Sequence, residues 1–350
     1  MLIGPYSFKQ AVKPLLAVIL CGILLIPPAG HGVSARAAAM PVATQLMNWF
    51  PESEHGGFYT AQDLNLYQKH GVDVKIQPFS FAYQGLDAIK EVALGKLTFA
   101  MANADDVYSA RSKGLPVVAV FATMQDDLQC FMWHANDKTI PATDPFAHFS
   151  NHTVVYGFGS TFWDYLLNKY HYTNVKTVNY DFTLRNFAAI PSSINQGYIS
   201  EEPYTAEHSK PPIHVKAALI ATTGYNPYYQ VIITSEDEVK NHPDVVRAYV
   251  AATIEGWRTY FSSHAALEKT NAYMRQDPTA KSFPLTPQSM DYAANAVKSI
   301  VMGGAARTHG IGYMSPARWV QLKQQLVSVG LKVGAVDPMS AFTDQFLPKM

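Results

Sequence analysis

Short β-branched runs alternate with helical patterns along this chain, and that alternation constrains its fold more than any single motif does. The runs "ATQLMNW" and "VDVKIQPF" are typical of strands, and "GGFYTAQDLNLYQKHG" between them has apolar residues at near-helical spacing as far as Gly71. A helix in "YQGLDAIKEVALG", a strand in "KLTFAMA", a helix in "DDVYSARSKG" and a strand in "PVVAVFAT" continue the pattern. Such alternation predicts α/β units around largely parallel sheets.

The pattern restarts after residue 135. "HTVVYGFGSTFWDYLLNKY" predicts a strand and a helix, and "YYQVIITSEDEVKNHPDVVRAYVAATIEGWRTYF" predicts a strand and two helices that return to the first unit. We therefore expect two α/β lobes, one inserted in the other, with a ligand cleft between them. The first lobe is expected at residues 40–135 and 226–350, which include C-terminal helices, and the second at residues 136–225.

The first 39 residues have the pattern of a secretory leader. Lys9 and Lys13 precede an apolar run, Leu15 to Ile26, that is too short to span a bilayer. "SARAAAM" then offers small residues for cleavage near Ala39. We interpret residues 1–39 as a signal peptide and expect a periplasmic protein.

Charge and cysteine content exclude several classes of protein. The leader has three basic residues and no acidic one, so the rest of the chain has 24 basic and 27 acidic residues. It has no positive surplus that would attract nucleic acid. Beyond the leader Cys130 is the one cysteine, which excludes an internal disulfide and a cysteine-rich metal site. A lipid anchor at Cys21 is an alternative, although Leu20 stands where a small residue is expected.

Three segments carry a resemblance to a known family. "NWFPESEHGGFYTAQDLNLYQKHGVDVKI", "GKLTFAMANADDVYSARSKGLPVVAV" and "SEDEVKNHPDVVRAYVAATIEGW" resemble, in this order, the family that joins exported ABC-transporter binding proteins to fungal thiamine-pyrimidine synthase. The resemblance implies a type II periplasmic-binding-protein clamshell, in agreement with the two expected lobes. Transport members bind thiamine pyrimidine precursors, aliphatic sulfonates, taurine or nitrate, so the family alone does not separate transport from catalysis.

The enzyme branch of this family needs residues that do not match here. In the synthase the first lobe holds a lysine for pyridoxal phosphate and a histidine consumed as substrate, whereas "AMANADD" places Ala102 and Asp106 after the third strand. Without an amine no Schiff base can form. The synthase also has a cysteine-rich run for iron, whereas residues 224–229 are "GYNPYY". We therefore expect no catalytic residue, no cofactor and no enzyme activity.

Ligand-binding residues are expected where strands end, because ligands of open α/β sheets lie beyond the carboxyl ends of strands. A flat heteroaromatic ring would stack on Trp49 or a tyrosine, and the amides of Asn48 and Asn103 would meet ring nitrogens. For Trp49 the alternative is packing behind the cleft. The candidate ligand-binding residues are Asn48, Trp49, His55, Tyr83, Asn103, Gly159, Ser160, Thr161, Trp163, Glu202, Tyr225 and Tyr228.

The segment "GFGSTFW" is a candidate for binding a polar or anionic group. Ser160 or Thr161 lies where a helix is expected to begin, so backbone N–H groups and hydroxyls there could face the cleft. The alternative is that Ser160 or Thr161 is only the N-cap of that helix.

The segment "GYISEEPYTAE" resembles the part of the family in which a glutamate meets the ligand. Pro203 predicts an extended conformation for Glu202, whose side chain would then face the cleft, with Glu201 as the alternative. A carboxylate there would suit an amino-pyrimidine and repel a sulfonate or nitrate. The other alternative is a solvated surface pair with Lys210.

The segment "ESEH" brings two acids and a histidine within four residues. Glu52, Glu54 and His55 lie in a loop that leads into a helix, where acids interact favourably with the helix dipole. No HxH or HExxH pattern accompanies them, so no metal site is expected. We interpret the group as a solvated helix start, with ligand contact as the alternative.

These observations predict an exported, monomeric solute-binding protein that delivers a small ligand to an ABC permease. The favoured ligand is polar, flat and heteroaromatic, similar to a thiamine pyrimidine precursor. The alternative is an aliphatic sulfonate, taurine or nitrate, and a synthase-like enzyme is less favoured.

The leader interpretation predicts that charged residues introduced into residues 18–25 abolish export, because the secretion machinery reads the apolar run. Fractionation of cells followed by immunoblotting measures this. Full periplasmic yield of the altered protein would show that the interpretation is wrong.

Overall fold

The computed structural model describes residues 39–80, 85–282 and 285–348. The chain divides into two compact units, residues 1–39 and residues 40–350, and only the second is considered below. Apart from Ala39, the expected leader lies outside the described residues, and so does Tyr83. Within the described ranges no helix is both long and apolar enough to cross a membrane.

A five-stranded mixed sheet forms the centre of the first lobe, in the order β2-β1-β3-β10-β4. Strand β1 pairs in parallel with β2 and β3, whereas β10 is antiparallel to both β3 and β4. The strands are β1 (Val42–Leu46), β2 (Asp73–Gln77), β3 (Thr98–Ala102), β4 (Val117–Met124) and β10 (Tyr229–Ser235).

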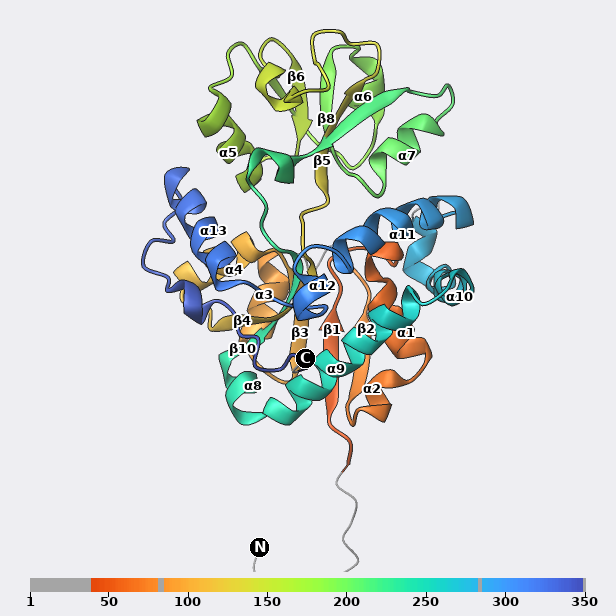
Figure 1. Ribbon diagram of the computed structural model, residues 1–350, viewed down its shortest axis with the longest axis vertical. Coiled ribbons are helices and arrows are strands. Elements are labelled where there is room, and N and C mark those ends of the chain that lie inside the picture. Colours follow the sequence, from red (N-terminus) through yellow and green to blue (C-terminus); the bar gives the residue numbers. More distant parts are fainter. Residues whose placement is uncertain (1–38, 81–84, 283–284, 349–350) are drawn as a thin grey trace, which may run out of the picture. The chain divides into compact units, whose positions relative to one another are not determined.

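The second lobe repeats this layout in the order β7-β6-β8-β5-β9. Figure 1 labels β5, β6 and β8 of this sheet. Here β5 is the strand that runs antiparallel to its two neighbours. The strands are β5 (Gln129–His134), β6 (Thr153–Tyr156), β7 (Lys176–Asn179), β8 (Ser193–Tyr198) and β9 (Val215–Leu219). The sheet therefore includes β5, so the second lobe begins before residue 136, where its start was expected.

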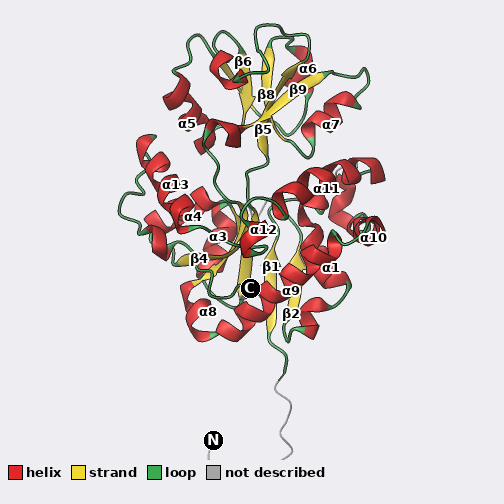
Figure 2. Cartoon of the chain, in the orientation of Figure 1, coloured by secondary structure: helices red, strands yellow, loops and turns green. Residues whose placement is uncertain are grey.

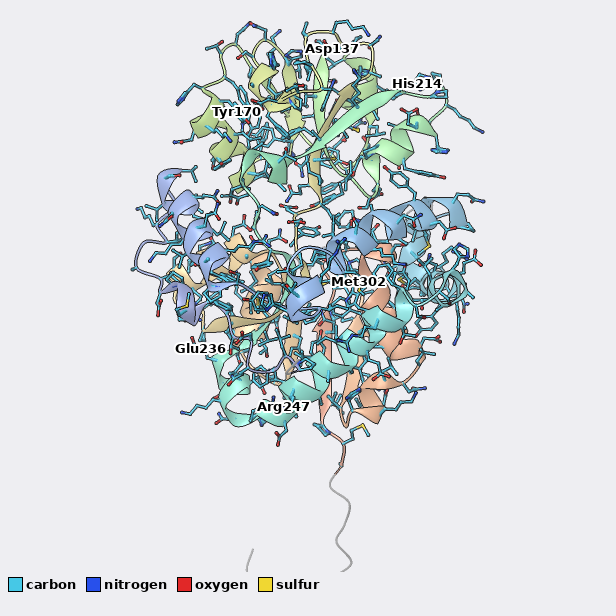
Figure 3. The ribbon with its side chains drawn as sticks, viewed as in Figure 1. Asp137, Tyr170, His214, Glu236, Arg247 and Met302 are labelled. Atoms are coloured by element: carbon cyan, nitrogen blue, oxygen red, sulfur yellow. The ribbon has the colours of Figure 1, made fainter. Side chains whose placement is uncertain are left out.

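Figure 3 labels Asp137, Tyr170 and His214 on the second lobe and Glu236, Arg247 and Met302 on the first.

Helices pack around both sheets (Figure 2). The helix expected over residues 56–71 is two helices, because Asn65 adopts a left-handed conformation with φ of 54°. The first lobe contains η1 (Ser53–His55), α1 (Gly56–Asp63), α2 (Leu66–Lys69), α3 (Leu86–Ala93), α4 (Ala104–Ser112), α8 (Glu236–Asn241), α9 (Pro243–Tyr260), α10 (His264–Met274), η4 (Pro278–Ser282), α11 (Pro287–Val301), α12 (Ala306–His309), α13 (Pro316–Ser328) and η5 (Pro338–Ser340). The second lobe contains η2 (Pro145–His148), α5 (Thr161–Tyr170), α6 (Arg185–Ala189), α7 (Glu202–Glu207) and η3 (Ile220–Thr223).

The first sheet is buried on both faces, as its nearly continuous apolar strands require. In β3, Phe99 and Met101 belong to one buried cluster, while Ala100 and Ala102 belong to the other. This follows from the alternation of side chains along a strand. Phe99 stacks on Tyr249 of α9 with ring centroids 3.9 Å apart. Helix α9 therefore anchors the face of the sheet that also carries α1.

The chain crosses between the lobes twice, at residues 125–128 and 224–228, and the two crossings are hydrogen-bonded to each other. The Asn226 side chain accepts from Asp127 N (3.0 Å) and donates to Asp126 Oδ1 (2.6 Å). Arg318 of α13 donates to the carbonyl oxygens of Gln125 and Asn226. These bonds join both crossings into one hinge attached to the first lobe.

Helix α1 begins directly after residues 48–55. Glycine residues in α1 and α9 allow these two helices to pack closely against each other. A Cβ atom at Gly256 would lie 2.1 Å from the carbonyl oxygen of Gly57, and one at Gly57 would lie 2.3 Å from the Trp257 ring. The backbones of the two helices therefore approach as closely as glycine allows.

We predict that Gly256→Ala lowers the free energy of unfolding by about 2 kcal/mol or more, because overpacking outweighs the roughly 1 kcal/mol that alanine gains in a helix. Urea unfolding followed by circular dichroism measures it. Gly334→Ala is the control, since no atom lies within 4 Å of its added Cβ. An unchanged midpoint for Gly256→Ala would refute the close-contact argument.

Candidate ligand-binding site

A cavity of about 370 Å³ lies at the carboxyl ends of strands from both sheets. Its walls come from the loop after β1, the loop after β7, the turn between β8 and α7, and the start of β10. The volume falls in the range of about 300–1,000 Å³ that is typical of small-molecule sites. The lining residues are Asn48, Trp49, Glu52, Glu54, Tyr180, Phe182, Thr183, Leu184, Tyr198, Glu201, Glu202, Thr205 and Tyr229.

Aromatic rings form a large part of this wall. Trp49 of the first lobe meets Phe182 of the second with ring centroids 5.4 Å apart and planes inclined by 34°. Trp49 also packs on Phe79, with centroids 5.0 Å apart. The Trp49 ring is thus both part of the packing and part of the cavity lining, and its contact with a ligand stays a prediction. Tyr198 and Tyr229 add a second pair of rings, 5.6 Å apart.

Four glutamates, two from each lobe, converge on the cavity. Glu52 and Glu54 precede α1, and Glu201 and Glu202 begin α7. Burial, followed by the nearby carboxylates, raises the pKa values of Glu52 and Glu201 well above their ordinary value. No lysine, arginine or histidine is among the described residues that line the cavity. The ionisable side chains of the described lining are therefore these carboxyl groups and tyrosine hydroxyls, and burial favours the protonated form of the carboxyl groups.

Glu54 connects the two lobes. One of its carboxylate oxygens accepts a hydrogen bond from the Ser200 hydroxyl of the second lobe, and the other accepts from the Gln230 amide at 3.1 Å. Burial raises the pKa of Glu54 to about 7, although the Ser200 bond acts in the opposite direction. Gln230 has a φ of 49°, a strained conformation at the start of β10 that aims its side chain at Glu54.

Glu202 has a hydrogen-bond donor on each carboxylate oxygen. The Tyr180 hydroxyl and the Tyr198 backbone N–H each donate to it at 2.6 Å. Burial raises the pKa of Glu202, and these bonds oppose the rise. Glu202 is only 8% exposed, which rules out the alternative of a solvated surface pair with Lys210.

The expected extended conformation of Glu202 is wrong. Glu202 is the first residue of α7 and Pro203 the second. Proline is well tolerated in the first turn of a helix, where its missing N–H leaves no bond unmade. Glu201, the other candidate, also lines the cavity.

His55 lies behind the cavity rather than in it. Its side chain is fully buried, and burial lowers its pKa to about 3, so the ring is neutral. The ring Nε2 lies 3.1 Å from Asn48 Oδ1, which can only accept, so Nε2 carries the proton. His55 thereby orients the Asn48 amide at the cavity wall.

The interpretation of "ESEH" as a solvated helix start is wrong. Glu52 and Glu54 are 8% and 4% exposed. Both acids are covered by the turn between β8 and α7 and by α11, whose residues line a second cavity with them. Burial against segments distant in the sequence explains why the local pattern was misleading.

The family model described as "NMT1/THI5 like" matches residues 52–264. The chain belongs to this family. The resemblance inferred from the sequence is thereby confirmed.

Sequence relatives of this NMT1/THI5-like protein include two named binding proteins. It is 22% identical to the riboflavin-binding protein RibY of Chloroflexus aurantiacus, over 95% of this chain and 98% of RibY. It is 28% identical to the formylaminopyrimidine-binding protein of Halalkalibacterium halodurans, over 33% of this chain and 34% of that protein.

Solved structures confirm the fold. The chain is similar to the periplasmic aliphatic sulphonate binding protein SsuA of Escherichia coli with a TM-score of 0.61. The identity is 11%, and the match covers 86% of this chain and 91% of SsuA. Such a likeness supports the type II periplasmic-binding-protein clamshell expected for this NMT1/THI5-like chain and says nothing of the ligand.

Three of the candidate ligand-binding residues near the hinge have other partners. Asn103 caps α4, and its Oδ1 accepts from Gln230 N at 3.4 Å. The Tyr225 hydroxyl donates to Asp105 at 2.9 Å, and the Tyr228 hydroxyl accepts from Ser315 N at 2.8 Å. Each of these side chains holds the first lobe or the hinge together, and none is among the described cavity-lining residues.

The segment "GFGSTFW" is also absent from the described cavity lining. Ser160 precedes α5, but its hydroxyl donates back to the Gly157 carbonyl at 2.6 Å instead of capping the helix. Thr161 begins α5, Gly159 adopts a positive φ of 86°, and Trp163 is buried in the second lobe. Among the candidates that the structure describes, Asn48, Trp49 and Glu202 line the cavity.

Several lining residues were not predicted. Tyr180 and Phe182 follow β7, whose sequence "KTVN" is short and polar and was not recognised as a strand. With that strand assigned, the rule that ligands lie at carboxyl ends would have selected both residues. Tyr198 ends β8 in the same way.

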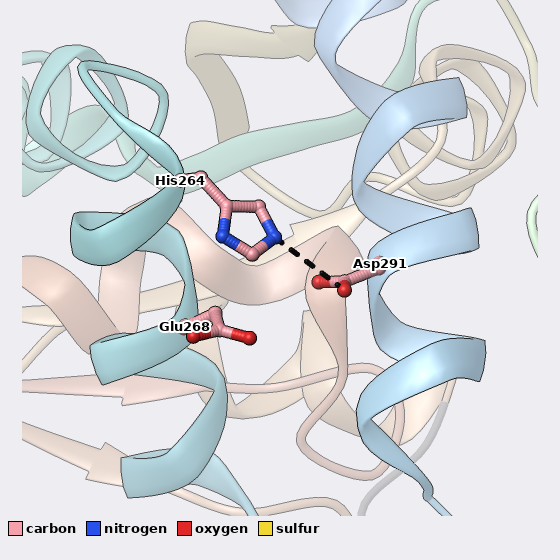
Figure 4. A group of neighbouring side chains, drawn as sticks. All are labelled: His264, Glu268 and Asp291. Atoms are coloured by element: carbon pink, nitrogen blue, oxygen red, sulfur yellow. Dashed lines mark ion pairs between the residues drawn. The ribbon is translucent and has the colours of Figure 1, made fainter.

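A group of possible metal ligands lies elsewhere, on α10 and α11 (Figure 4). His264 Nε2 lies 3.5 Å from Asp291 Oδ2, and Glu268 is one helical turn from His264. His264 and Glu268 are exposed. Water competes strongly for such groups, so a weak surface ion pair accounts for the arrangement.

The buried position of Glu54 predicts a specific pH dependence. Folding raises its pKa from 4.5 to about 7, so the folded protein keeps a proton that the unfolded chain releases between these values. Wild type should therefore lose stability as pH rises from about 4.5 to about 7. We predict that Glu54→Gln gains about 2 kcal/mol relative to wild type between pH 5 and pH 8, at about 1.36 kcal/mol per pKa unit.

Urea unfolding of both proteins over this pH range measures the effect. Glu91→Gln, at an exposed position of α3, is the matched control and should run parallel to wild type. Parallel curves for Glu54→Gln and wild type would contradict the prediction.

Proposed function

We propose that this protein is an exported solute-binding protein that captures a flat heteroaromatic ligand and presents it to an ABC permease. Membership of the family and similarity to RibY over nearly the whole length support the binding role. The cavity between two lobes supports it as well, because ligands of such folds lie between their lobes. The protein has no catalytic function in this proposal.

The observation that carries the ligand class is the pairing of aromatic rings with four glutamates in one cavity. Trp49 and Phe182 offer ring faces for stacking, and carboxylates accept hydrogen bonds from N–H and O–H groups. The titratable side chains of the described lining are carboxyl groups and tyrosine hydroxyls, so a sulfonate or nitrate would meet no positive charge there and would meet negative charge wherever a carboxyl group is ionised. Electrostatic repulsion therefore disfavours these anions.

The ligands in the names of the two sequence relatives are consistent with this class. Riboflavin and formylaminopyrimidine both contain a flat nitrogen heterocycle with hydrogen-bond donors. We favour an amino-pyrimidine, because Glu202 and the Asn48 amide together suit an exocyclic amine beside a ring nitrogen. Riboflavin is the second candidate, since RibY matches 95% of this chain.

Ligand binding would act through the relative positions of the lobes. Trp49 and Glu54 belong to the first lobe, and Phe182 and Glu202 to the second, so a ligand in the cavity touches both. A ligand that makes these contacts only when the lobes are together shifts the population toward the closed state. The joined crossings at Asn226 would serve as the hinge.

We predict that Trp49→Ala and Glu202→Gln each weaken binding of an amino-pyrimidine by about tenfold or more. Trp49→Ala removes a stacking face, and Glu202→Gln removes a charged acceptor with little change of shape, each worth about 1–2 kcal/mol. Isothermal titration calorimetry against an amino-pyrimidine, riboflavin, taurine and nitrate measures the affinities.

Phe158→Ala and Glu91→Gln are matched controls, because both side chains are exposed and neither lines the cavity. Glu202→Gln should leave taurine and nitrate binding unchanged or strengthen it. The heteroaromatic assignment fails if neither the amino-pyrimidine nor riboflavin binds wild type, or if Trp49→Ala leaves the affinity of the bound compound unchanged.

A further inference from the structure

A second, smaller cavity of about 50 Å³ adjoins the first. Glu52, Glu54, Glu201 and Thr205 line both cavities, so the two spaces share an acidic wall. Ser53 and Ser200 add hydroxyls, and Met290 of α11 closes an apolar side. A water molecule needs about 10–15 Å³ in this measure, so the space suits one small polar group and not a ring.

Glu52 is the unusual member of this wall. It is 8% exposed, and no hydrogen bond to its carboxylate is found among the described residues. Its backbone carbonyl accepts from His55 N at 2.8 Å, which holds the residue in place. A carboxylate that is buried and unpartnered costs several kcal/mol unless a ligand, a proton or water satisfies it.

The neighbouring glutamates differ in the hydrogen bonds that their carboxylates accept. Glu54 accepts from Ser200 and Gln230. No hydrogen bond to the carboxylate of Glu201 is found among the described residues either. Glu52 and Glu201 belong to different lobes, and both line the small cavity. Their carboxyl groups can accept hydrogen bonds from a group bound there.

The small cavity suits an organic cation better than a metal ion. Among the described residues, the group of three possible metal ligands whose atoms lie within 4.8 Å of one another is His264, Glu268 and Asp291, not the acids of this wall. Carboxylate acceptors from two different segments match the several N–H donors of an ammonium or amidinium group.

We propose that the small cavity is a subsite for a protonated amino or amidinium substituent of the ligand, held between Glu52 and Glu201. This inference rests on the proposed heteroaromatic function, because the ring from which the substituent extends occupies the larger cavity. The cation balances the two carboxylates that the lobes bring together. Recognition of the substituent therefore needs both lobes in place.

The test compares an aminomethyl-pyrimidine with the same pyrimidine carrying a methyl group in place of the aminomethyl group. Calorimetric titration of the full-length mature protein at neutral pH measures both affinities. We expect the aminomethyl compound to bind wild type at least tenfold more tightly. Glu52→Gln should reduce that preference to less than threefold.

Glu91→Gln is the matched control and should keep the full preference. Equal affinities of the two compounds for wild type, absence of binding by the aminomethyl compound, or an unchanged preference in Glu52→Gln would each overturn the subsite. The proposed function fails separately, if the methyl compound and riboflavin also do not bind wild type. Circular dichroism and the urea midpoint of Glu52→Gln establish that the variant is folded.

Discussion

Four glutamates share one buried cavity, and their loss of hydration and mutual repulsion constrain the residues around them. Removing a carboxylate from water costs several kcal/mol unless donors compensate. Glu202 receives two donors from its own lobe, whereas Glu54 receives one from each lobe, Ser200 and Gln230. Glu52 has no such donor among the described residues. The charge that remains has to be balanced by protons or by the ligand.

In the proposed binding role, the two-lobed architecture gives this constraint a function. Each lobe carries two of the acids, so bringing the lobes together raises the repulsion and a suitable ligand lowers it. A ligand with several donors would therefore stabilise the closed arrangement more than the open one. The bonds of Asn226 and Arg318 join the two crossings between the lobes to each other and to the first lobe.

Much of the fold was predictable because strands and helices leave local periodicities. The expected strands of the first lobe agree with β1, β2, β3, β4 and β10 to within a few residues. The rule that ligands lie at carboxyl ends selected Asn48 and Trp49 correctly as cavity residues. The break at Asn65 and the strand β7 were missed, because a left-handed residue and a short polar strand leave little trace in hydrophobic periodicity.

The sequence by itself determined the α/β class, the two lobes, the family and the residues at the end of the first strand. Tertiary structure decided which polar residues are buried. Glu54 appeared to belong to a solvated helix start, yet Ser200 and Gln230, which are 146 and 176 residues away, enclose it. Ser160 and Asn103 appeared equally suited to a ligand, yet their bonds lie elsewhere. A local pattern describes what a segment can expose, whereas burial and charge balance depend on the distant segments that cover it.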